Sequence, residues 1–297
     1  MGASQAAPSQ KFFTSNTAAL PPSAPARAWW TWLLALGVAA LIWWSFRGVG
    51  VDLGMLLGSE SRRQMLSYLL DLYPPDLTSA TVRSALWGSI ETLAISLMGT
   101  LLAVLIALLM VGGASRALTT SGVLFTMPGA GRGRRLTLLG LSLLARGILN
   151  ILRAIPELIW ALIFILAVGL GPFAGVLALG VHTGGVLGKL YAETVESLDP
   201  QPLEALQATG AGKVAIFLYG MLPQAAPHFL AYGLYRWEVN IRAAAILGFV
   251  GAGGLGKQMY VSLSLFHHHQ LLTQLLALFV LVTFVDAVST WLRRRLS

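Results

Sequence analysis

Residues Glu204–Pro223 have the sequence EALQATGAGKVAIFLYGMLP and carry only one acid and one base, Glu204 and Lys213. This weakly polar, glycine-containing stretch lies between two long apolar segments. A chain that interrupts its apolar sequence in this way places the intervening segment outside the apolar environment. The local structure of this stretch is therefore the first question that the sequence raises.

Helix signals flank this stretch. Asp199 is a suitable N-cap, and Pro200 and Pro202 fall in the first turn, where a missing N–H costs little. Gly210 and Gly212 end or bend the helix that follows, since glycine adopts the backbone conformation of a helix C-terminus readily. The sequence therefore predicts a short helix over about 199–209.

A second short helix is predicted over residues 213–220, ending before Pro223. The product is an elbow of helix, glycine and helix over residues 199–223, with small side chains such as Ala205 and Ala208 on its surface. Such an elbow suits docking into a groove on a partner protein. It equally fits an interfacial helix that rests on lipid headgroups, and the residues alone favour neither interpretation.

The composition places the chain in a membrane. Of its 297 residues, 56% are hydrophobic and 11% charged, and the mean hydropathy is +0.73. Soluble domains average about 25% charged residues and do not contain uncharged segments of about 20 residues. The net charge of +8 does not indicate nucleic acid, because the basic residues cluster at the edges of apolar segments.

The apolar segments predict six membrane-spanning helices in an all-α protein. The third has to include Arg153 and Glu157, because Leu158–Val168 alone is too short to cross a bilayer. The second is Thr92–Ser115, with a start near Ser89. The other expected spans are Ala28–Phe46, about Gly147–Val168, Phe173–Leu190, Phe229–Val250 and Leu271–Trp291.

The distribution of basic residues predicts the orientation. With both termini in the cytoplasm, six crossings place the basic loop 112–135, the elbow and Arg293–Arg295 on the cytoplasmic side, as the positive-inside rule requires. A seventh crossing in 136–152 would move the arginine triplet outside. Residues 1–27, rich in Ala, Ser and Pro, are predicted to be a disordered cytoplasmic tail before a transmembrane domain over 28–297.

Charged residues inside the spans need partners or water, since each costs about 2.5–3.5 kcal/mol at the bilayer centre. Glu238 and Arg242 are four residues apart and are expected to pair, as are Arg153 and Glu157. Arg236 has no local partner. These groups are either structural pairs or, for Arg236 above all, part of a polar path for a small oxyanion, which a guanidinium binds through its fork of donors.

The sequence GAGGLG fits the pattern G-x-G-x-x-G, with glycines at Gly251, Gly253, Gly254 and Gly256. A dinucleotide site requires a preceding strand in a βαβ unit, and this run instead closes a membrane span. It is therefore either a flexible turn or backbone that lines a translocation path.

Several other kinds of site are excluded or disfavoured. The chain has no cysteine, no P-loop and no hydrolase motif, and its one close carboxylate pair, Glu193 and Glu196, lies in a predicted loop. Adjacent histidines such as His267–His269 do not converge on one metal ion in a regular helix. His182 is expected to be packed and Asp286 to pair with the arginine triplet. We predict no metal, no cofactor and no catalytic residues.

The elbow resembles the EAA motif of permease subunits in binding-protein-dependent ABC importers. That motif has Glu-Ala-Ala, a glycine after three residues, an isoleucine after nine more and then Leu-Pro after one. The matching residues are Glu204, Ala205, Gly210, Leu222 and Pro223. Leu206 replaces the second alanine and Gly220 the usual isoleucine. The resemblance implies that the elbow is the coupling helix that sits in a cleft of an ATP-hydrolysing subunit.

A finer resemblance covers about residues 146–256, through blocks such as ILRAIPELIWALIFILAVGLGP and YRWEVNIRAAAILGFVGAGGLG. These are similar to the permease of phosphonate importers and its phosphite and hypophosphite relatives. The resemblance implies a type I importer fold in the bacterial inner membrane, a homodimer, two copies of an ATP-binding subunit and an external solute-binding protein. A secondary transporter or channel without an ATPase partner is the alternative.

Overall fold

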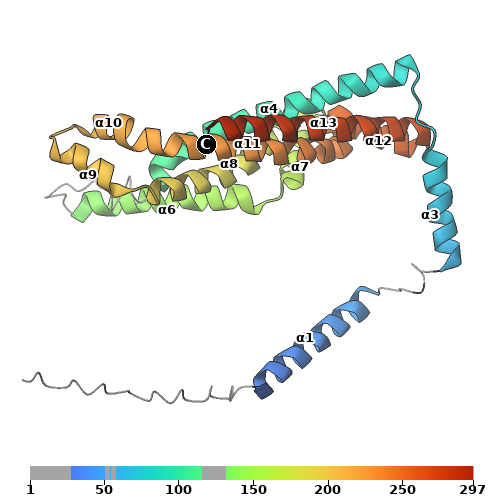
Figure 1. Ribbon diagram of the computed structural model, residues 1–297, viewed down its shortest axis with the longest axis horizontal. Helices are drawn as coiled ribbons and strands as arrows, with labels where there is room; N and C mark the ends of the chain where they lie inside the picture. Colours follow the sequence, from blue (N-terminus) through green and yellow to red (C-terminus); the bar gives the residue numbers. More distant parts are fainter. Residues whose placement is uncertain (1–27, 51–53, 55–57, 116–131, 297) are drawn as a thin grey trace, which may run out of the picture. The chain divides into compact units, whose positions relative to one another are not determined.

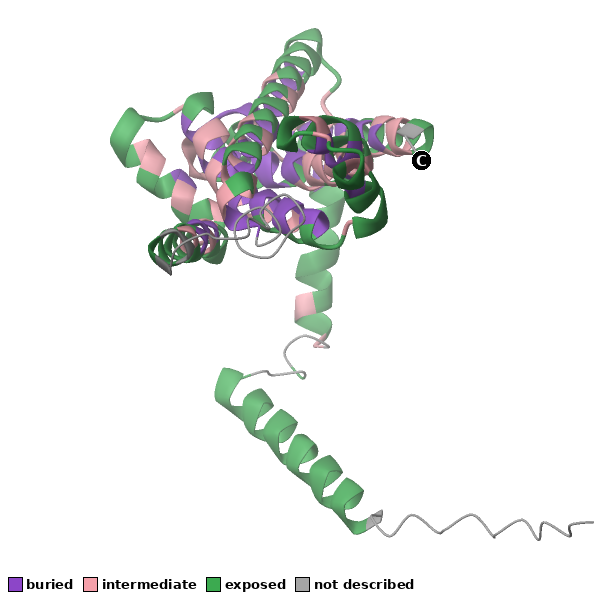
Figure 2. Cartoon of the chain, turned by 90° about the vertical axis from the view of Figure 1, so that its left-hand side faces the viewer, coloured by how far each residue is buried: buried purple, intermediate pink, exposed green. Residues whose placement is uncertain are grey.

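The computed structural model describes residues 28–50, 54, 58–115 and 132–296, and within these residues all regular structure is helical (Figure 1). The predicted tail, 1–27, lies outside the described residues. The chain divides into two units, Met1–Met65 and Leu66–Ser297, of which the second holds a helical bundle. In the first unit, the long apolar helix α1 (Ala28–Val49) is exposed from Trp29 onward (Figure 2).

The remaining helices follow in chain order. They are α3 (Ser59–Leu72), α4 (Ser79–Ala114), α6 (Arg132–Ala154), α7 (Glu157–Val168), α8 (Pro172–Glu196), α9 (Pro200–Ala208), α10 (Lys213–Ala215), the π-helix η1 (Ile216–Met221), α11 (Leu222–Leu247), the π-helix η2 (Gly248–Ala252), α12 (Gly254–Ser264) and α13 (His268–Leu296).

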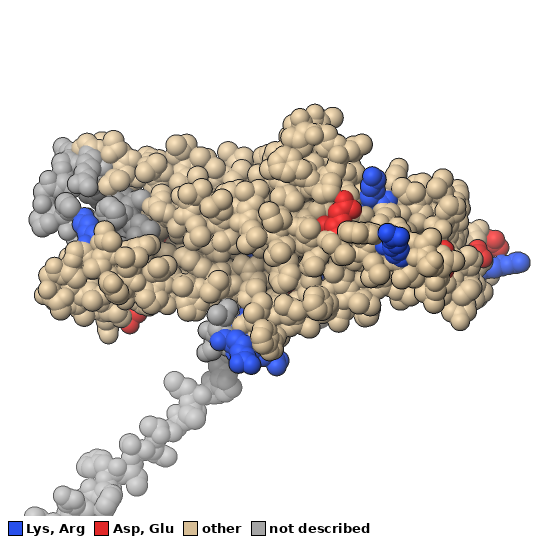
Figure 3. All heavy atoms as spheres, turned by 90° about the horizontal axis from the view of Figure 1, so that it is seen from above, with Lys and Arg blue, Asp and Glu red and all other residues tan. Residues whose placement is uncertain are grey.

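Six of the described helical segments are long and apolar enough to cross a membrane, which confirms the predicted number. Their bounds are Trp29–Val49, Ser79–Ala114, Leu136–Ala154, Pro172–Glu196, Lys213–Ala252 and His268–Arg295. Uncharged side chains cover most of the bundle face in Figure 3. Such a surface fits a lipid environment, since water-soluble proteins rarely expose large apolar patches.

The third predicted span is wrong in its bounds, because the third candidate span is Leu136–Ala154, where the distribution of basic residues argued against a crossing. Instead of one helix from Gly147 to Val168, α6 ends at Ala154 and α7 begins at Glu157. Pro156 causes the break because it lacks an N–H and its ring disfavours a continuous helix. The Trp160 indole N–H donates to Leu152 O at 3.1 Å, and this bond replaces the one that the proline nitrogen cannot make.

Two other predicted boundaries also shift. The helix of the second span begins earlier than predicted, at Ser79 and not near Ser89, and residues 73–78 separate α4 from α3. The predicted basic loop 112–135 is shorter at both ends, because α4 extends to Ala114 and α6 begins at Arg132. Residues 116–131 of that loop lie outside the described part of the chain.

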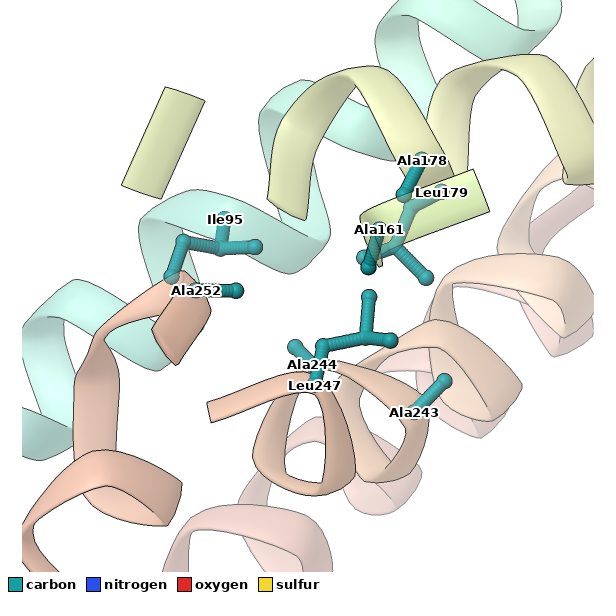
Figure 4. Packing of buried hydrophobic residues seen from close by; sticks show 8 residues of the cluster. All are labelled: Ile95, Ala161, Ala178, Leu179, Ala243, Ala244, Leu247 and Ala252. Carbon is teal, nitrogen blue, oxygen red and sulfur yellow. The ribbon is translucent and has the colours of Figure 1, made fainter. Parts of the chain in front are cut away.

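Small residues allow the bundle helices to approach closely. One buried cluster brings together residues of α4, α7, α8, α11 and η2 (Figure 4). Its members are Ile95, Ala161, Ala178, Leu179, Ala243, Ala244, Leu247 and Ala252. Between α4 and α8, side chains fill the space that glycine leaves: a Cβ on Gly184 would lie 3.0 Å from Ile106 Cβ. Such small-residue contacts are typical of helices packed in membranes.

Candidate coupling elbow and intramembrane polar groups

The elbow forms as its sequence predicts over residues 199–212. The Asp199 carboxylate accepts a hydrogen bond from Gln201 N at 3.0 Å, so it caps α9. Gly210, with φ of +81°, lies in the left-handed region just after the helix, where glycine carries no steric penalty. The turn closes with a hydrogen bond from Ala211 N to Leu206 O at 3.2 Å.

The second arm of the elbow does not stop at Pro223, contrary to the prediction. The segment Lys213–Ala215 leads through η1 into α11, and Pro223 lies in the first turn of that helix. In η1, Leu222 N donates to Phe217 O, five residues earlier. This wider π-helical turn lets the chain continue past a residue without an N–H.

A hydrophobic cluster fixes the elbow against the bundle. Leu203 of α9 is buried together with Val195, Ile216 and Met221. Glu204 and Ala205, on the same helix, are exposed. The elbow therefore has one face held by the bundle and one face free for contact.

Among the charged residues of α11, Glu238 and Arg242 belong to a network with α13. Arg242 Nη2 lies 3.5 Å from Glu238 Oε1, as predicted, and also donates to both carboxylate oxygens of Asp286 at 3.0 and 2.8 Å. Arg293 of the terminal triplet donates to Glu238 at 2.9 Å. Asp286 thus pairs with Arg242 and not with the triplet, and the two acids and two bases satisfy one another.

Arg236 lies outside this network. Its Nε is buried and has no hydrogen-bond partner among the described residues. Glu157 lies near enough to interact electrostatically with the Arg236 guanidinium. Glu157 does not pair with Arg153 as predicted: its carboxylate lies 3.6 Å from His182 Nε2, and His182 Nδ1 lies 2.9 Å from Ile155 O. The break at Pro156 redirects Glu157 in this way.

The glycine run forms the junction between α11 and α12. Gly251, Gly253 and Gly254 have φ values of +104°, +87° and +69°, which disfavour any side chain there. A Cβ on Gly256 would collide with Ala245 O, so α12 packs directly on the backbone at the end of α11. The run begins inside the π-helix η2 and no strand precedes it, which rules out a βαβ dinucleotide site at this position.

The comparisons with known proteins decide the family. Residues 133–297 match the model for "Binding-protein-dependent transport system inner membrane component". The chain is 36% identical over 270 residues to the phosphite transport system permease protein PtxC of Stutzerimonas stutzeri, with 90% of each chain covered. It is 40% identical over 152 residues to the phosphate-import permease protein PhnE of Mycolicibacterium smegmatis, covering 51% of this chain and 29% of that one. This chain belongs to the binding-protein-dependent transport permeases.

The fold of this permease agrees with that assignment. An inward-facing MetNI methionine ABC transporter structure superposes with a TM-score of 0.61 at 20% identity, covering 74% of this chain and 100% of that one. The permease is thus a multi-pass inner-membrane protein with the fold of a type I importer subunit, and the sequence resemblance is confirmed.

Sequence reasoning missed a buried polar chain at the centre of the permease. Thr183 of α8 donates to Asn240 Oδ1 at 2.9 Å, and Asn240 Nδ2 donates to Thr100 Oγ1 of α4 at 2.9 Å. All three residues are buried. The signal available in the sequence was the amide of Asn240 between Glu238 and Arg242 in a predicted span, since an amide has to find partners inside a membrane.

A second group that was missed lies beside the glycine junction. The Thr92 hydroxyl accepts a hydrogen bond from Leu255 N at 2.8 Å. A Cβ on Gly253 would lie 2.6 Å from Glu91 Oε1, so this carboxylate lies directly against the glycine backbone. The predicted start of the second span near Ser89 already included Glu91, but its partner could not be known without the fold.

Proposed function

We propose that this permease imports a small phosphorus oxyanion, and that ATP hydrolysis on a separate subunit drives the import. The observation that carries the proposal is the elbow: Glu204 and Ala205 are exposed on α9 while Leu203 holds the same helix in the bundle. A force applied to the exposed face would therefore reach α8 and α11 through packed side chains.

The substrate class rests on the relatives. They are named for phosphite and phosphate transport, and the resemblance in the sequence includes phosphonate and hypophosphite permeases. A tetrahedral oxyanion of this kind is the ligand that the fork of a guanidinium binds well. We assign the choice among these anions to an external solute-binding protein.

In the assembly that we propose, two copies of this permease contact two ATP-binding subunits through residues of the elbow. The contact residues are Glu204, Ala205 and Gly210, with Leu222 and Pro223 supporting the second arm. Both termini face the cytoplasm in this arrangement, and ATP binding switches the permease dimer between outward-facing and inward-facing states.

For the translocation path we propose Arg236 as the group that meets the anion. Its buried Nε lacks a protein partner among the described residues, whereas Glu238 and Arg242 are satisfied by α13. Glu238 and Arg242 therefore border the path, and the glycine junction of Gly251, Gly253, Gly254 and Gly256 lines it with backbone.

Co-purification tests the coupling part of the proposal. The permease is co-expressed with the ATP-binding subunit of the same transport system, and the complex is isolated through a tag on the permease. We expect a stable complex that is lost when Glu204 is changed to Lys or Gly210 to Val. Gly212→Ala is the matched control, because nothing lies within 4 Å of a Cβ at that position. A complex that survives both elbow variants would contradict the proposal.

A further inference from the structure

A cavity of about 230 Å³ lies between α6, α8 and the end of α4, apart from the elbow surface and from Arg236. Its lining residues are Ala114, Arg146, Leu149, Asn150, Arg153, Lys189, Ala192 and Glu193. Three of these are basic, and they come from two different helices, α6 and α8. The cavity is thus a concentration of positive charge within a chain that has few charges.

The basic residues of this cavity are neutralised only in part. Arg146 is held by Glu196 and by Ala114 O, and Lys189 Nζ lies 3.4 Å from Glu193 Oε1. Arg153 has a single neutral partner, Asn150, whose Oδ1 accepts a hydrogen bond from Nε at 3.0 Å. Within the described ranges no carboxylate forms an ion pair with Arg153. The cavity therefore keeps one positive charge in excess, with guanidinium N–H groups left to donate.

The depth of the cavity matches the headgroup layer. Lys189 lies about 26 Å along α8 from Pro172, taking about 1.5 Å per residue. The hydrocarbon core of a bilayer is about 30 Å thick. Measured from the start of α8 at Pro172, Lys189 therefore lies near the opposite edge of such a core, about 4 Å inside it, at the end where α8 leads into the elbow (Figure 1).

Apolar surface adjoins the cavity on the same helix. Ile151, between Asn150 and Arg153 on α6, is 60% exposed, and Ile148 is 37% exposed. A phosphate group in the cavity would therefore have a hydrocarbon-facing surface beside it, where acyl chains pack. A free anion would make no use of that surface.

We propose that this cavity binds the phosphate of an anionic phospholipid such as phosphatidylglycerol. Arg153 supplies the guanidinium donors, Lys189 a second positive charge, and Asn150 orients the Arg153 side chain. Basic pockets between membrane helices recognise lipid headgroups by this chemistry. The site is independent of the transported anion and of the ATP-binding subunit.

Native mass spectrometry of the detergent-purified full chain tests the site, with phosphatidylglycerol and zwitterionic phosphatidylcholine offered in equal amounts. We expect a preference for phosphatidylglycerol that falls about tenfold in Arg153→Gln and in Lys189→Gln, since a hydrogen bond to a charged group contributes about 1.5–3 kcal/mol. Arg153→Lys should keep part of the preference. The matched control is Lys257→Gln, which removes an exposed positive charge outside the cavity.

Two results would overturn the proposal. One is equal retention of phosphatidylglycerol by Arg153→Gln and Lys257→Gln. The other is binding of inorganic phosphate or phosphite that depends on Arg153 while phosphatidylglycerol shows no preference, because the cavity would then serve a free anion. Melting temperatures of each variant, measured without added lipid, separate loss of binding from loss of folding.

Discussion

Leu206 occupies the space that Gly220 leaves open: a Cβ on Gly220 would lie 2.9 Å from Leu206 Cδ1 and 2.7 Å from Leu203 Cδ2. These two positions are the departures from the EAA pattern, in which the first is alanine and the second isoleucine. Leu206 on α9 is larger than the alanine of the pattern, and Gly220 on η1 is smaller than the isoleucine, so the gain of side-chain volume on one side of the contact offsets the loss on the other. The two departures therefore compensate each other and preserve the packing of the elbow.

This relationship predicts coupled effects of substitution. Gly220→Ala should destabilise the permease by about 1–3 kcal/mol, because the new methyl group overpacks the contacts with Leu203 and Leu206. The double variant Gly220→Ala/Leu206→Ala should lose less stability than the sum of the two single variants. Thermal unfolding in detergent measures this, with Gly212→Ala as the glycine control that meets no neighbouring atoms. Strict additivity would argue against compensation.

The ion pair between Arg242 and Asp286 predicts a second coupled pair. Arg242→Met should cost about 1 kcal/mol, since these side chains are partly exposed. Adding Asp286→Leu should restore most of that loss, because no unpaired carboxylate then remains between α11 and α13. Melting temperatures of the single and double variants, with Lys257→Met as the charge control, provide the test. A double variant less stable than Arg242→Met would show that the unpaired Asp286 carboxylate is not the cause of the stability lost in Arg242→Met.

Substitution of the buried Asn240 is predicted to cause a larger loss of stability. Asn240→Leu removes the acceptor of the Thr183 hydroxyl, and leaving such a buried group unsatisfied costs about 1–3 kcal/mol. Removing that hydroxyl as well, in Asn240→Leu/Thr183→Val, should recover part of the stability. If the second substitution adds to the loss instead, packing volume and not hydrogen bonding controls this position.

Asp76 predicts a dependence on pH at the junction between α3 and α4. The Thr81 hydroxyl, which donates to Asp76 Oδ2 at 2.6 Å, is the main cause that lowers the pKa of this carboxyl below 3.8, and Thr78 N adds to it. A lowered pKa means that the carboxylate stabilises the folded junction above pH 3.8, and that this contribution is lost as the pH falls through the lower folded-state pKa.

Hydrogen exchange of the Thr78 amide measures that contribution. We expect its protection to persist as the pH is lowered to 3.8 and to weaken below it, after correction for the intrinsic exchange rate. Thr81→Val should move the loss of protection to higher pH, because the pKa then returns toward its ordinary value. Protection that does not differ between Asp76→Asn and the unaltered chain at neutral pH would exclude this role for Asp76.

The sequence predicts the membrane class, the number of spans and the first arm of the elbow, because each rests on local signals. Long apolar segments, the N-cap at Asp199 and the left-handed glycine at Gly210 need no tertiary information. The positions of prolines were harder to interpret. Pro156 ends a helix, and the Trp160 indole N–H then binds the carbonyl of Leu152 that the proline leaves free. Pro223 is instead accommodated by a π-helical turn. The sequence does not distinguish these two outcomes.

The partners of the charged residues likewise depend on the tertiary structure, which the sequence does not show directly. Spacing along one helix predicted Arg153 with Glu157, but the break between α6 and α7 sends Glu157 to His182 on α8. Contacts between helices also decide the partners of Asp286 and Asn240. Local spacing therefore predicted contacts within one continuous helix, and the tertiary structure determined the others.

In the mechanism that we propose, ATP hydrolysis on another subunit acts through the elbow to move an anion across this permease. The most direct measurement is uptake of labelled phosphite into proteoliposomes that contain the permease, its ATP-binding subunit and the solute-binding protein. We expect uptake that requires ATP, falls about tenfold or more in Arg236→Gln and is abolished in Glu204→Lys. Uptake down a gradient by the permease alone, without nucleotide, would contradict it and favour a channel or secondary transporter.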